Sequence, residues 1–427
     1  MSRRLTVVNF VITLCAVVTG PLTARALGPA GRGDLAAVIV VGTLVSSFGD
    51  FGLSAFVVRD TATRTPVRKL IGSIGPLLLS LGICWAIAGP LIARMVAGNR
   101  DTVYWLLLVI MLLTPIQLVT ASTNSILWGQ QRWSLFTVMR LTVPVGTAVA
   151  FAVLFAVGHL TVETAGIVFI VLGVFVSSLP GLVALRGVGR PEWHSAIARR
   201  GSAYAIRVWL AGLANQTNAR LDQLLMTRLV TPSQLGIYAV AVNVSLMQAG
   251  LTVAVSQALL PRVASGDAHL AGRALRVMVA LTALMGAALI VAVPFVVPFV
   301  FGNRFSGAVV MCQILLVAAV PFGAVQIMTS VLAGLGRPSQ VARAELLSVC
   351  ITVPALLLFV HQYGGVGAAV ISVAAYSCTA VYLAIQLRPL LGLSWSSMFI
   401  MRPSDVSMLR ALPIIRNLVR QPTDHDS

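Results

Sequence analysis

Apolar stretches, each long enough to cross a lipid bilayer as a helix, follow one another along almost the whole of this sequence. A helix needs about 20 predominantly apolar residues to span the hydrocarbon layer. Twelve stretches fit that length, at residues 5–27, 35–58, 70–97, 103–127, 134–158, 164–186, 204–227, 234–260, 274–301, 307–333, 342–361 and 364–388. Only 10% of the residues are charged, against about a quarter in a soluble domain. We therefore predict an all-α, multi-pass membrane protein with about twelve transmembrane helices.

Several classes of function are disfavoured by the same composition. The net charge of +18 does not indicate nucleic-acid binding, because the basic residues lie in short loops between apolar stretches. The five cysteines lie inside apolar stretches without a CxxC pair, so we expect neither a disulfide framework nor a metal site. No P-loop is present, so ATP hydrolysis is not expected. We expect no cofactor, and the apolar run at 1–26 is too long for a signal peptide and is expected to form the first helix.

The orientation in the membrane follows from the basic residues. An even number of helices places both termini on one side. With that side in the cytoplasm, 23 of the 30 Arg and Lys residues are cytoplasmic, six are on the opposite side and Arg220 is within the membrane. Cytoplasmic loops carry the excess of positive charge in membrane proteins. We expect a protein of the bacterial cytoplasmic (inner) membrane with both termini in the cytoplasm.

The longest internal loop divides the chain into two sets of six helices. We expect an N-terminal six-helix bundle at 1–186, a cytoplasmic linker at 187–203 and a C-terminal six-helix bundle at 204–388. The basic tail at 389–427 is expected in the cytoplasm, with an interfacial helix at 404–421 followed by disorder.

The two halves resemble each other. A shift of 203 residues aligns Arg25 with Arg228, Pro29 with Pro232, Gly33 with Gly236, Ala36 with Ala239, Ala55 with Ala258, and Arg59 with Arg262. A second block, from Ser125 to Ser134, aligns with 330–339 at a shift of 205. Two halves of equal topology are related by an axis along the membrane normal, a design typical of transporters with a central cavity.

One helix, at 204–227, carries far more polar residues than the others. Arg207, Asn215, Asn218 and Asp222 share one stripe of it, while Arg220 points the opposite way. Each charge at mid-membrane costs about 2.5–3.5 kcal/mol on insertion scales. The stripe should therefore face protein or a water-filled cavity, and the first half has no equivalent of its mid-membrane part.

Two segments, at 23–60 and 219–264, resemble the bacterial polysaccharide (Wzx-type) flippases of the multidrug/oligosaccharidyl-lipid/polysaccharide exporter superfamily. The matching positions are Arg25, Leu27, Gly28, Pro29, Gly33, Arg220, Asp222, Gly236, Tyr238, Ala258, Leu259, Pro261 and Arg262. The motifs cover about a fifth of the chain and the topology nearly all of it. The resemblance implies a flippase that moves a polyprenyl-diphosphate-linked oligosaccharide between leaflets.

The resemblance implies roles for particular residues. Arg25, Arg220 and Arg207 would bind the diphosphate, since arginine binds phosphate bidentately. Sugars would be bound by polar side chains, namely Asn215, Asn218, Gln223, Asn9 and Asn124. Asp222 and Asp50 would couple transport to H⁺ or Na⁺. The structural alternatives are that the amides are ties between helices, that Arg25 extends to the headgroups, and that Asp50 is a polar helix contact.

We therefore expect a secondary transporter rather than an enzyme, acting by alternating access in surface polysaccharide synthesis. The expected partners are the lipid-linked oligosaccharide, membrane lipids, and polysaccharide polymerase and glycosyltransferases. The alternatives are a lipid II flippase, a cation-coupled exporter of drugs or amphiphiles, and a membrane-embedded glycan-assembly enzyme or scaffold.

Overall fold

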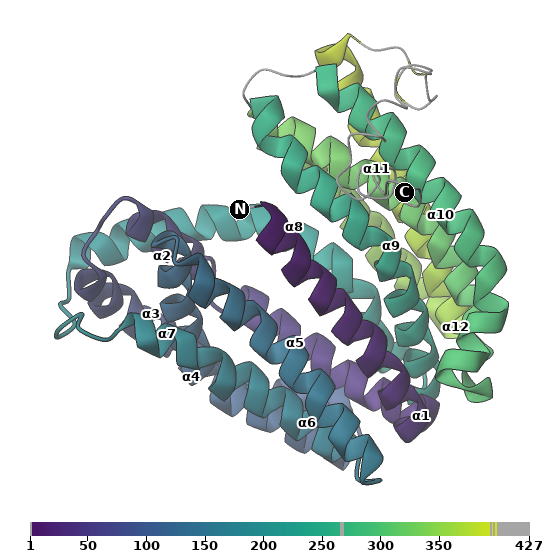
Figure 1. Cartoon of the computed structure of the whole chain (residues 1–427), viewed down its shortest axis with the longest axis horizontal. Helices are drawn as coiled ribbons and strands as arrows, with labels where there is room; N and C mark the ends of the chain where they lie inside the picture. Colours follow the sequence, from purple (N-terminus) through teal and green to yellow (C-terminus); the bar gives the residue numbers. More distant parts are fainter. Residues whose placement is uncertain (1, 265–268, 393–394, 396–397, 399–427) are drawn as a thin grey trace, which may run out of the picture. The chain divides into compact units, whose positions relative to one another are not determined.

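The computed structural model describes residues 2–264 and 269–392, together with Trp395 and Met398 (Figure 1). Within this part of the chain the secondary structure is helical and contains no strand. The interfacial helix expected at 404–421 lies outside the described residues.

The helices follow one another with short connections. Their bounds are α1 Ser2–Phe48, α2 Leu53–Ala62, α3 Val67–Ala97, α4 Asp101–Gly129, α5 Trp133–Ala156, α6 Val162–Ile170, α7 Leu179–Ala184, α8 Ser195–Leu229, α9 Pro232–Ala264, α10 His269–Phe301, α11 Ala308–Gly334 and α12 Pro338–Leu391. A π-helical turn at Val171–Phe175 and a 3₁₀ turn at Val176–Ser178 join α6 to α7, and a further 3₁₀ turn spans Asn303–Phe305.

The two longest helices each contain two expected spans. Gly28 breaks α1 with φ 66° and ψ −178°, and Gly364 breaks α12 with φ 55° and ψ −139°. Both conformations lie in the region of positive φ, which glycine adopts most readily. Eight helices among the described residues are long and apolar enough to cross a membrane. When each broken helix is counted as two and the more polar α8 and α9 are added, the helices correspond to the twelve predicted spans.

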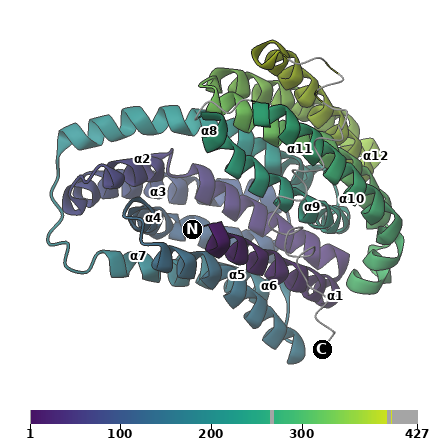
Figure 2. The ribbon, with the colours of Figure 1, turned by 45° about the horizontal axis from the view of Figure 1, so that its top comes forward.

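The chain forms two compact units. The first comprises residues 1–240, 297–308 and 356–365, and the second comprises 241–296, 309–355 and 366–427. In the first unit α3 packs against α4, α1 packs against α5, and α8 lies along α1, α2 and α3 (Figure 2). Helix α8 begins at Ser195, inside the linker expected at 187–203. A helix can continue beyond the apolar stretch that hydropathy detects, because charged side chains are well hydrated outside the membrane.

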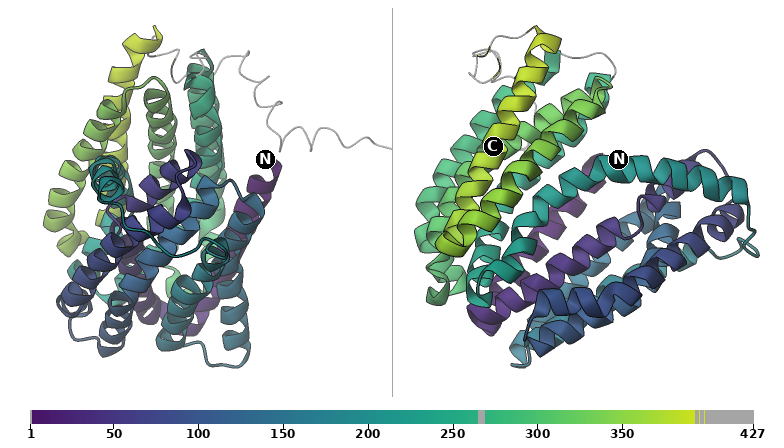
Figure 3. Two further views of the ribbon diagram at one scale, coloured as in Figure 1. Left: turned by 90° about the vertical axis from the view of Figure 1, so that its left-hand side faces the viewer. Right: turned by 180° about the vertical axis from the view of Figure 1, so that it is seen from behind.

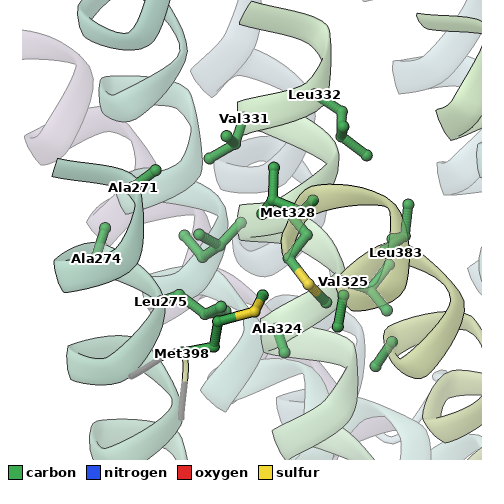
Figure 4. Packing of buried hydrophobic residues seen from close by; sticks show 14 of the residues in the cluster. Ala271, Ala274, Leu275, Ala324, Val325, Met328, Val331, Leu332, Leu383 and Met398 are labelled. Atoms are coloured by element: carbon green, nitrogen blue, oxygen red, sulfur yellow. The ribbon is translucent and has the colours of Figure 1, made fainter. Parts of the chain in front are cut away.

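The second unit has an apolar core between α10, α11 and α12. In this unit α11 and the C-terminal part of α12 lie side by side (Figure 3). Met328 of α11 lies at the centre of the core, between Leu275 of α10 and Leu383 of α12 (Figure 4). Met398, which is fully buried, belongs to the same core and lies beside Leu275 (Figure 4).

Candidate functional site

An acid of the predicted polar helix has a specific partner on the next helix. Asp222 of α8 accepts a hydrogen bond of 2.5 Å from the hydroxyl of Tyr238 on α9, and its other oxygen accepts one of 2.7 Å from the backbone N–H of Gln223. The Tyr238 side chain is fully buried. Arg220 lies two positions before Asp222 on the same helix. An acid and a phenol are thus held together across two helices, with a cation two positions away on one of them.

The three arginines expected to bind the diphosphate do not lie together. Arg207 and Arg220 are on the same continuous helix, 13 positions apart, which is roughly 20 Å at 1.5 Å per residue. Arg207 is exposed and Arg220 is partly buried. Arg25 is exposed and donates to the backbone oxygens of Val300 at 3.0 Å and Phe299 at 2.5 Å, at the end of α10. One diphosphate therefore cannot contact Arg207 and Arg220 at once in this conformation.

Asp50, the second acid expected to carry an ion, caps a helix. Its two oxygens accept the backbone amides of Gly52 at 2.9 Å and Ser54 at 3.0 Å, at the start of α2. The N-cap residue of α2 is Gly52, so Asp50 satisfies amides at the helix N-terminus from two positions before the cap. The cap exists because the predicted span at 35–58 is interrupted between Phe48 and Leu53. The geometry agrees with the structural alternative for this residue, while its role in ion coupling remains a prediction.

The interruption between α1 and α2 is also a docking point for α8. The Trp209 indole of α8 donates to the Phe48 carbonyl at 3.1 Å and stacks on the Phe51 ring at 4.8 Å between centroids. A methyl group on Gly52 would lie 2.5 Å from the Ala205 carbonyl oxygen. The freed end of α1 is thus satisfied by a side chain from α8, as a broken membrane helix requires.

Asn124 joins two helices. Its Nδ2 donates to the Ser177 carbonyl at 3.1 Å, within the irregular turns between α6 and α7. Its Oδ1 is buried without a hydrogen-bond partner in the structure. Gln117, on the same helix, donates in a similar way to the Ser46 hydroxyl at 2.7 Å. Asn124 is therefore placed as a tie between helices, and sugar binding by it remains a prediction.

The remaining expected sugar ligands are only partly accounted for. Gln223 is buried, with 3% of its surface exposed. The side chains of Asn9, Asn215 and Asn218 lie outside the described residues.

Tyr238 and Trp209 make contacts that reasoning from the sequence does not assign. In the sequence Tyr238 is only one position of a motif. It lies in the second turn of α9, and a short connection separates α9 from the end of α8, which carries Asp222. A phenol in an apolar helix beside an intramembrane acid is the signal that indicates the pair, since a buried tyrosine hydroxyl usually finds a partner.

One cavity in the described part of the chain has an apolar lining. A cavity of about 270 Å³ in the second unit is lined mainly by apolar side chains, including Val279, Val320, Ala324, Val381 and Trp395. Among the described residues there is no group of three or more His, Cys, Asp or Glu side chains that could bind a metal ion.

Comparison with known families identifies the chain. The family described as "Polysaccharide biosynthesis protein" matches residues 4–266, more than half of the sequence. The chain belongs to this family. A search of curated proteins finds no match.

Solved structures share the fold. The inward closed conformation of the lipid II flippase MurJ has a TM-score of 0.75 at 13% identity, over 97% of this chain and 99% of that one. An inward-facing multidrug resistance MATE transporter of the MOP superfamily has a TM-score of 0.67 at 14% identity, over 89% and 94%. The MATE multidrug transporter DinF-BH has a TM-score of 0.62 at 16% identity, over 92% and 96%.

The predicted fold class is thereby confirmed. This member of the polysaccharide biosynthesis family has the helical fold of those flippase and transporter structures, with several helices long and apolar enough to cross a membrane.

Proposed function

We propose that this protein is a flippase that translocates polyprenyl-diphosphate-linked oligosaccharide units across the bacterial inner membrane for surface polysaccharide synthesis. Family membership carries the proposal, because it links the chain to polysaccharide biosynthesis. The fold shared with a lipid II flippase supports it, since lipid II is the cargo named for that protein. Both termini would lie in the cytoplasm, as the distribution of arginine indicates.

The residues around Asp222 would form the working centre of this flippase. Arg220 would bind one phosphate of the cargo, because a guanidinium offers two parallel donors to phosphate oxygens. Asp222 would bind H⁺ or Na⁺, with the Tyr238 hydroxyl as its partner in the empty state. Binding of the cation at Asp222 and binding of the phosphate at Arg220 would then influence each other, because the two residues are two positions apart on α8. The membrane potential would supply about 2.3 kcal/mol per charge for each 100 mV.

Alternating access would follow from this arrangement. The cargo's diphosphate and sugars cannot cross hydrocarbon unaided, so they need a polar path that opens to one side at a time. Arg207 lies far from Arg220 along α8, and Arg25 contacts the end of α10. We therefore assign these two arginines to the ends of the path rather than to its centre. The polyprenyl chain would stay in the lipid beside the helices.

The second candidate is a lipid II flippase, favoured by the similarity to the MurJ structure. The two cargoes share a polyprenyl diphosphate and differ in the saccharide, so the same arginine would serve either. A cation-coupled drug exporter is the third candidate, on the similarity to MATE transporters.

The test is a deletion strain in which lipid-linked oligosaccharide is quantified and its leaflet is located with a membrane-impermeant probe. We expect the intermediate to accumulate on the cytoplasmic side and the wild-type gene to reverse this. The Asp222→Asn variant should fail to reverse it at normal protein levels. Asp101→Asn is the matched control, because Asp101 is exposed at the start of α4. Unchanged lipid-linked pools with intact surface glycan would overturn the proposal, and altered drug susceptibility would then favour the exporter.

A further inference from the structure

The cavity of about 270 Å³ in the second unit has a buried floor and an exposed rim. Its floor consists of small side chains of α11 and α12, because Ala324, Ala380 and Ala384 line it and are at most 8% exposed. Its rim consists of larger side chains that remain accessible, since Val381 is 55% exposed and Trp395 is 43% exposed. The cavity is therefore an apolar pocket that reaches the surface of the unit.

The pocket lies in the cytoplasmic half of the expected membrane spans. Val279 on its wall is ten positions after His269, the start of α10, which is roughly 15 Å at 1.5 Å per residue. Ser377 on its wall is 11 positions before Arg388 in α12, which is roughly 16 Å. The distribution of basic residues places the start of α10 and the end of α12 in the cytoplasm. Half of the hydrocarbon layer is about 15 Å thick, so the wall of the pocket extends to about the middle of the bilayer.

A cation lies at the cytoplasmic mouth of this pocket. Helix α12 ends at Leu391, and its C-cap Gly392 is left-handed, with φ 62° and ψ 28°. Such a residue ends a helix and turns the chain, and Trp395 then lies against the same cavity as α12. The guanidinium carbon of Arg388 is 5.6 Å from the centroid of the Trp395 ring. Arg388 is exposed, so its guanidinium can reach the headgroups while the indole that it covers lines the pocket.

We propose that the pocket binds an acyl chain of an anionic phospholipid from the cytoplasmic leaflet, with the lipid phosphate at Arg388. An apolar floor suits hydrocarbon and does not suit a sugar or a diphosphate. Arginine offers two parallel donors to phosphate oxygens, and basic pockets between membrane helices on the cytoplasmic side bind anionic headgroups. Tryptophan is enriched at the level of the headgroups, which is where Trp395 would lie.

The occupant is a membrane lipid rather than the cargo of the proposed function. The pocket belongs to the second unit, whereas Arg220 and Asp222 belong to the first. Its lining along α12, from Ser377 to Ala384, covers seven positions, or roughly 10 Å. This length holds one end of a straight acyl chain and is short for a polyprenyl chain. A bound chain would contact α10, α11 and α12 together, so the lipid would stabilise the second unit whatever the transported molecule is.

The experiment measures lipid binding to the purified full-length protein in detergent. Phosphatidylglycerol is the anionic probe and phosphatidylcholine with the same acyl chains is the zwitterionic probe, and bound lipid is counted by native mass spectrometry as each is titrated. Arg388→Gln removes the charge at the mouth, and its matched control Arg199→Gln removes an exposed arginine of α8 in the first unit. Ala380→Leu fills the floor of the pocket, and its matched control Ala374→Leu adds the same atoms at an exposed position of α12.

We expect one phosphatidylglycerol molecule to bind more tightly than phosphatidylcholine. Arg388→Gln should weaken its affinity about tenfold, the loss expected when a charged hydrogen-bonding partner is removed, and should make the two lipids equal. Ala380→Leu should weaken the affinity for both lipids by about tenfold or more, because methylene groups lose their buried site. Both control variants should bind as the parent does.

The absence of a tight phosphatidylglycerol site in the parent, or equal affinity for both lipids, overturns the proposal. Unchanged binding in both test variants also overturns it. Since Arg388 is exposed, its variant should fold even if Ala380→Leu does not, and thermal unfolding without lipid identifies a misfolded variant. A polyprenyl phosphate is titrated as a third probe, and tighter binding of it than of phosphatidylglycerol would assign the pocket to the carrier lipid and overturn the proposal. None of these measurements involves transport, so their failure would leave the proposed flippase function unaffected.

Discussion

In the first unit Gly33 packs against the Pro232 carbonyl and Gly236 packs against the Pro29 carbonyl, a backbone contact called here the seam. The seam and the Asp222 site meet on α9, two positions apart at Gly236 and Tyr238, but they treat the internal repeat in opposite ways. At the seam the repeated residues are identical, and each contact has its mirror in the other half. At the site the repeat is broken. Asp222 stands where the first half has Thr19, and Tyr238 stands where the first half has Leu35. Both Leu35 and Tyr238 are fully buried, so equivalent buried positions hold an apolar side chain in one half and a phenol in the other.

This difference separates scaffold from chemistry. A symmetric contact is what two segments related by an internal repeat form when they pack against each other. An acid is costly inside a membrane helix, and the pair of an acid and a phenol is present in the second half of the repeat only. The asymmetry therefore marks the residues that bear a function beyond folding, and variants that erase or restore it are the most direct tests.

The largest effect should come from making the second half resemble the first. We expect the double variant Asp222→Thr, Tyr238→Leu to reduce export of the lipid-linked oligosaccharide to the level of the deletion strain. The reason is that the helix loses its acid and the acid's hydrogen-bond donor together. Export is measured as surface glycan, normalised to the amount of protein in the membrane. The shape-preserving Asp222→Asn should give the same loss, and normal export in that variant would contradict the site.

A smaller effect is expected when only the donor is removed. In Tyr238→Phe the ring keeps its place and the 2.5 Å hydrogen bond to Asp222 is lost. A hydrogen bond to a charged group contributes about 1.5–3 kcal/mol, so the export rate should fall by about 10-fold or more. The dependence of export on pH or sodium should also shift, because the acid has lost its partner.

The control for this prediction is Tyr104→Phe in α4. Tyr104 is a partly buried tyrosine that stacks edge-on against Trp105. Equal export rates for the two phenylalanine variants would show that Tyr238 only fills space.

Most of the fold was predictable because the bilayer allows few structures. A spanning segment must satisfy its own backbone, so an apolar stretch of sufficient length becomes a helix. The breaks were harder to predict. Asp50 reads as an intramembrane acid in the sequence, yet it caps α2, because the chain leaves the helix between Gly49 and Gly52. A hydropathy value is averaged over a window longer than such a turn, so it does not detect the break.

The site was predictable only in part, for a related reason. The acid at Asp222 is visible because a charge in an apolar helix is conspicuous. Its partner Tyr238 is not, because a tyrosine is unremarkable in a membrane helix and the contact joins two helices. The arginines show the reverse problem: Arg25 and Arg207 were grouped with Arg220 by residue type, and the length of α8 separates Arg207 from Arg220.

Asp50 offers a test of the capping interpretation at the break between α1 and α2. Asp50→Ala removes the acceptor of two backbone amides and should lower the free energy of unfolding by about 0.5–2 kcal/mol. Asp50→Asn keeps a side-chain oxygen that can accept from these amides, and it should restore most of that stability and normal export. Thermal unfolding in detergent measures the first effect, and surface glycan measures the second. A folded Asn variant without export would show that the charge itself is needed, and Asp50 would then join Asp222 as a coupling acid.

The smallest effect is expected at the far end of α8. Arg207 is exposed and roughly 20 Å from Arg220 along the helix, so Arg207→Gln should change stability by no more than about 0.5 kcal/mol, as for most surface substitutions. Export at saturating cargo should stay near the wild-type rate, whereas Arg220→Gln should lose it. If Arg207 serves cargo entry, the loss will be seen only when cargo synthesis is limited, as a weaker apparent affinity with an unchanged maximal rate.

A loss of maximal rate in Arg207→Gln as large as that in Arg220→Gln would place both arginines in one working centre. The two ends of α8 would then have to approach the same phosphate in another conformation. Scaffold and chemistry could no longer be assigned to separate parts of this helix, and the asymmetry between the halves would extend to its cytoplasmic end.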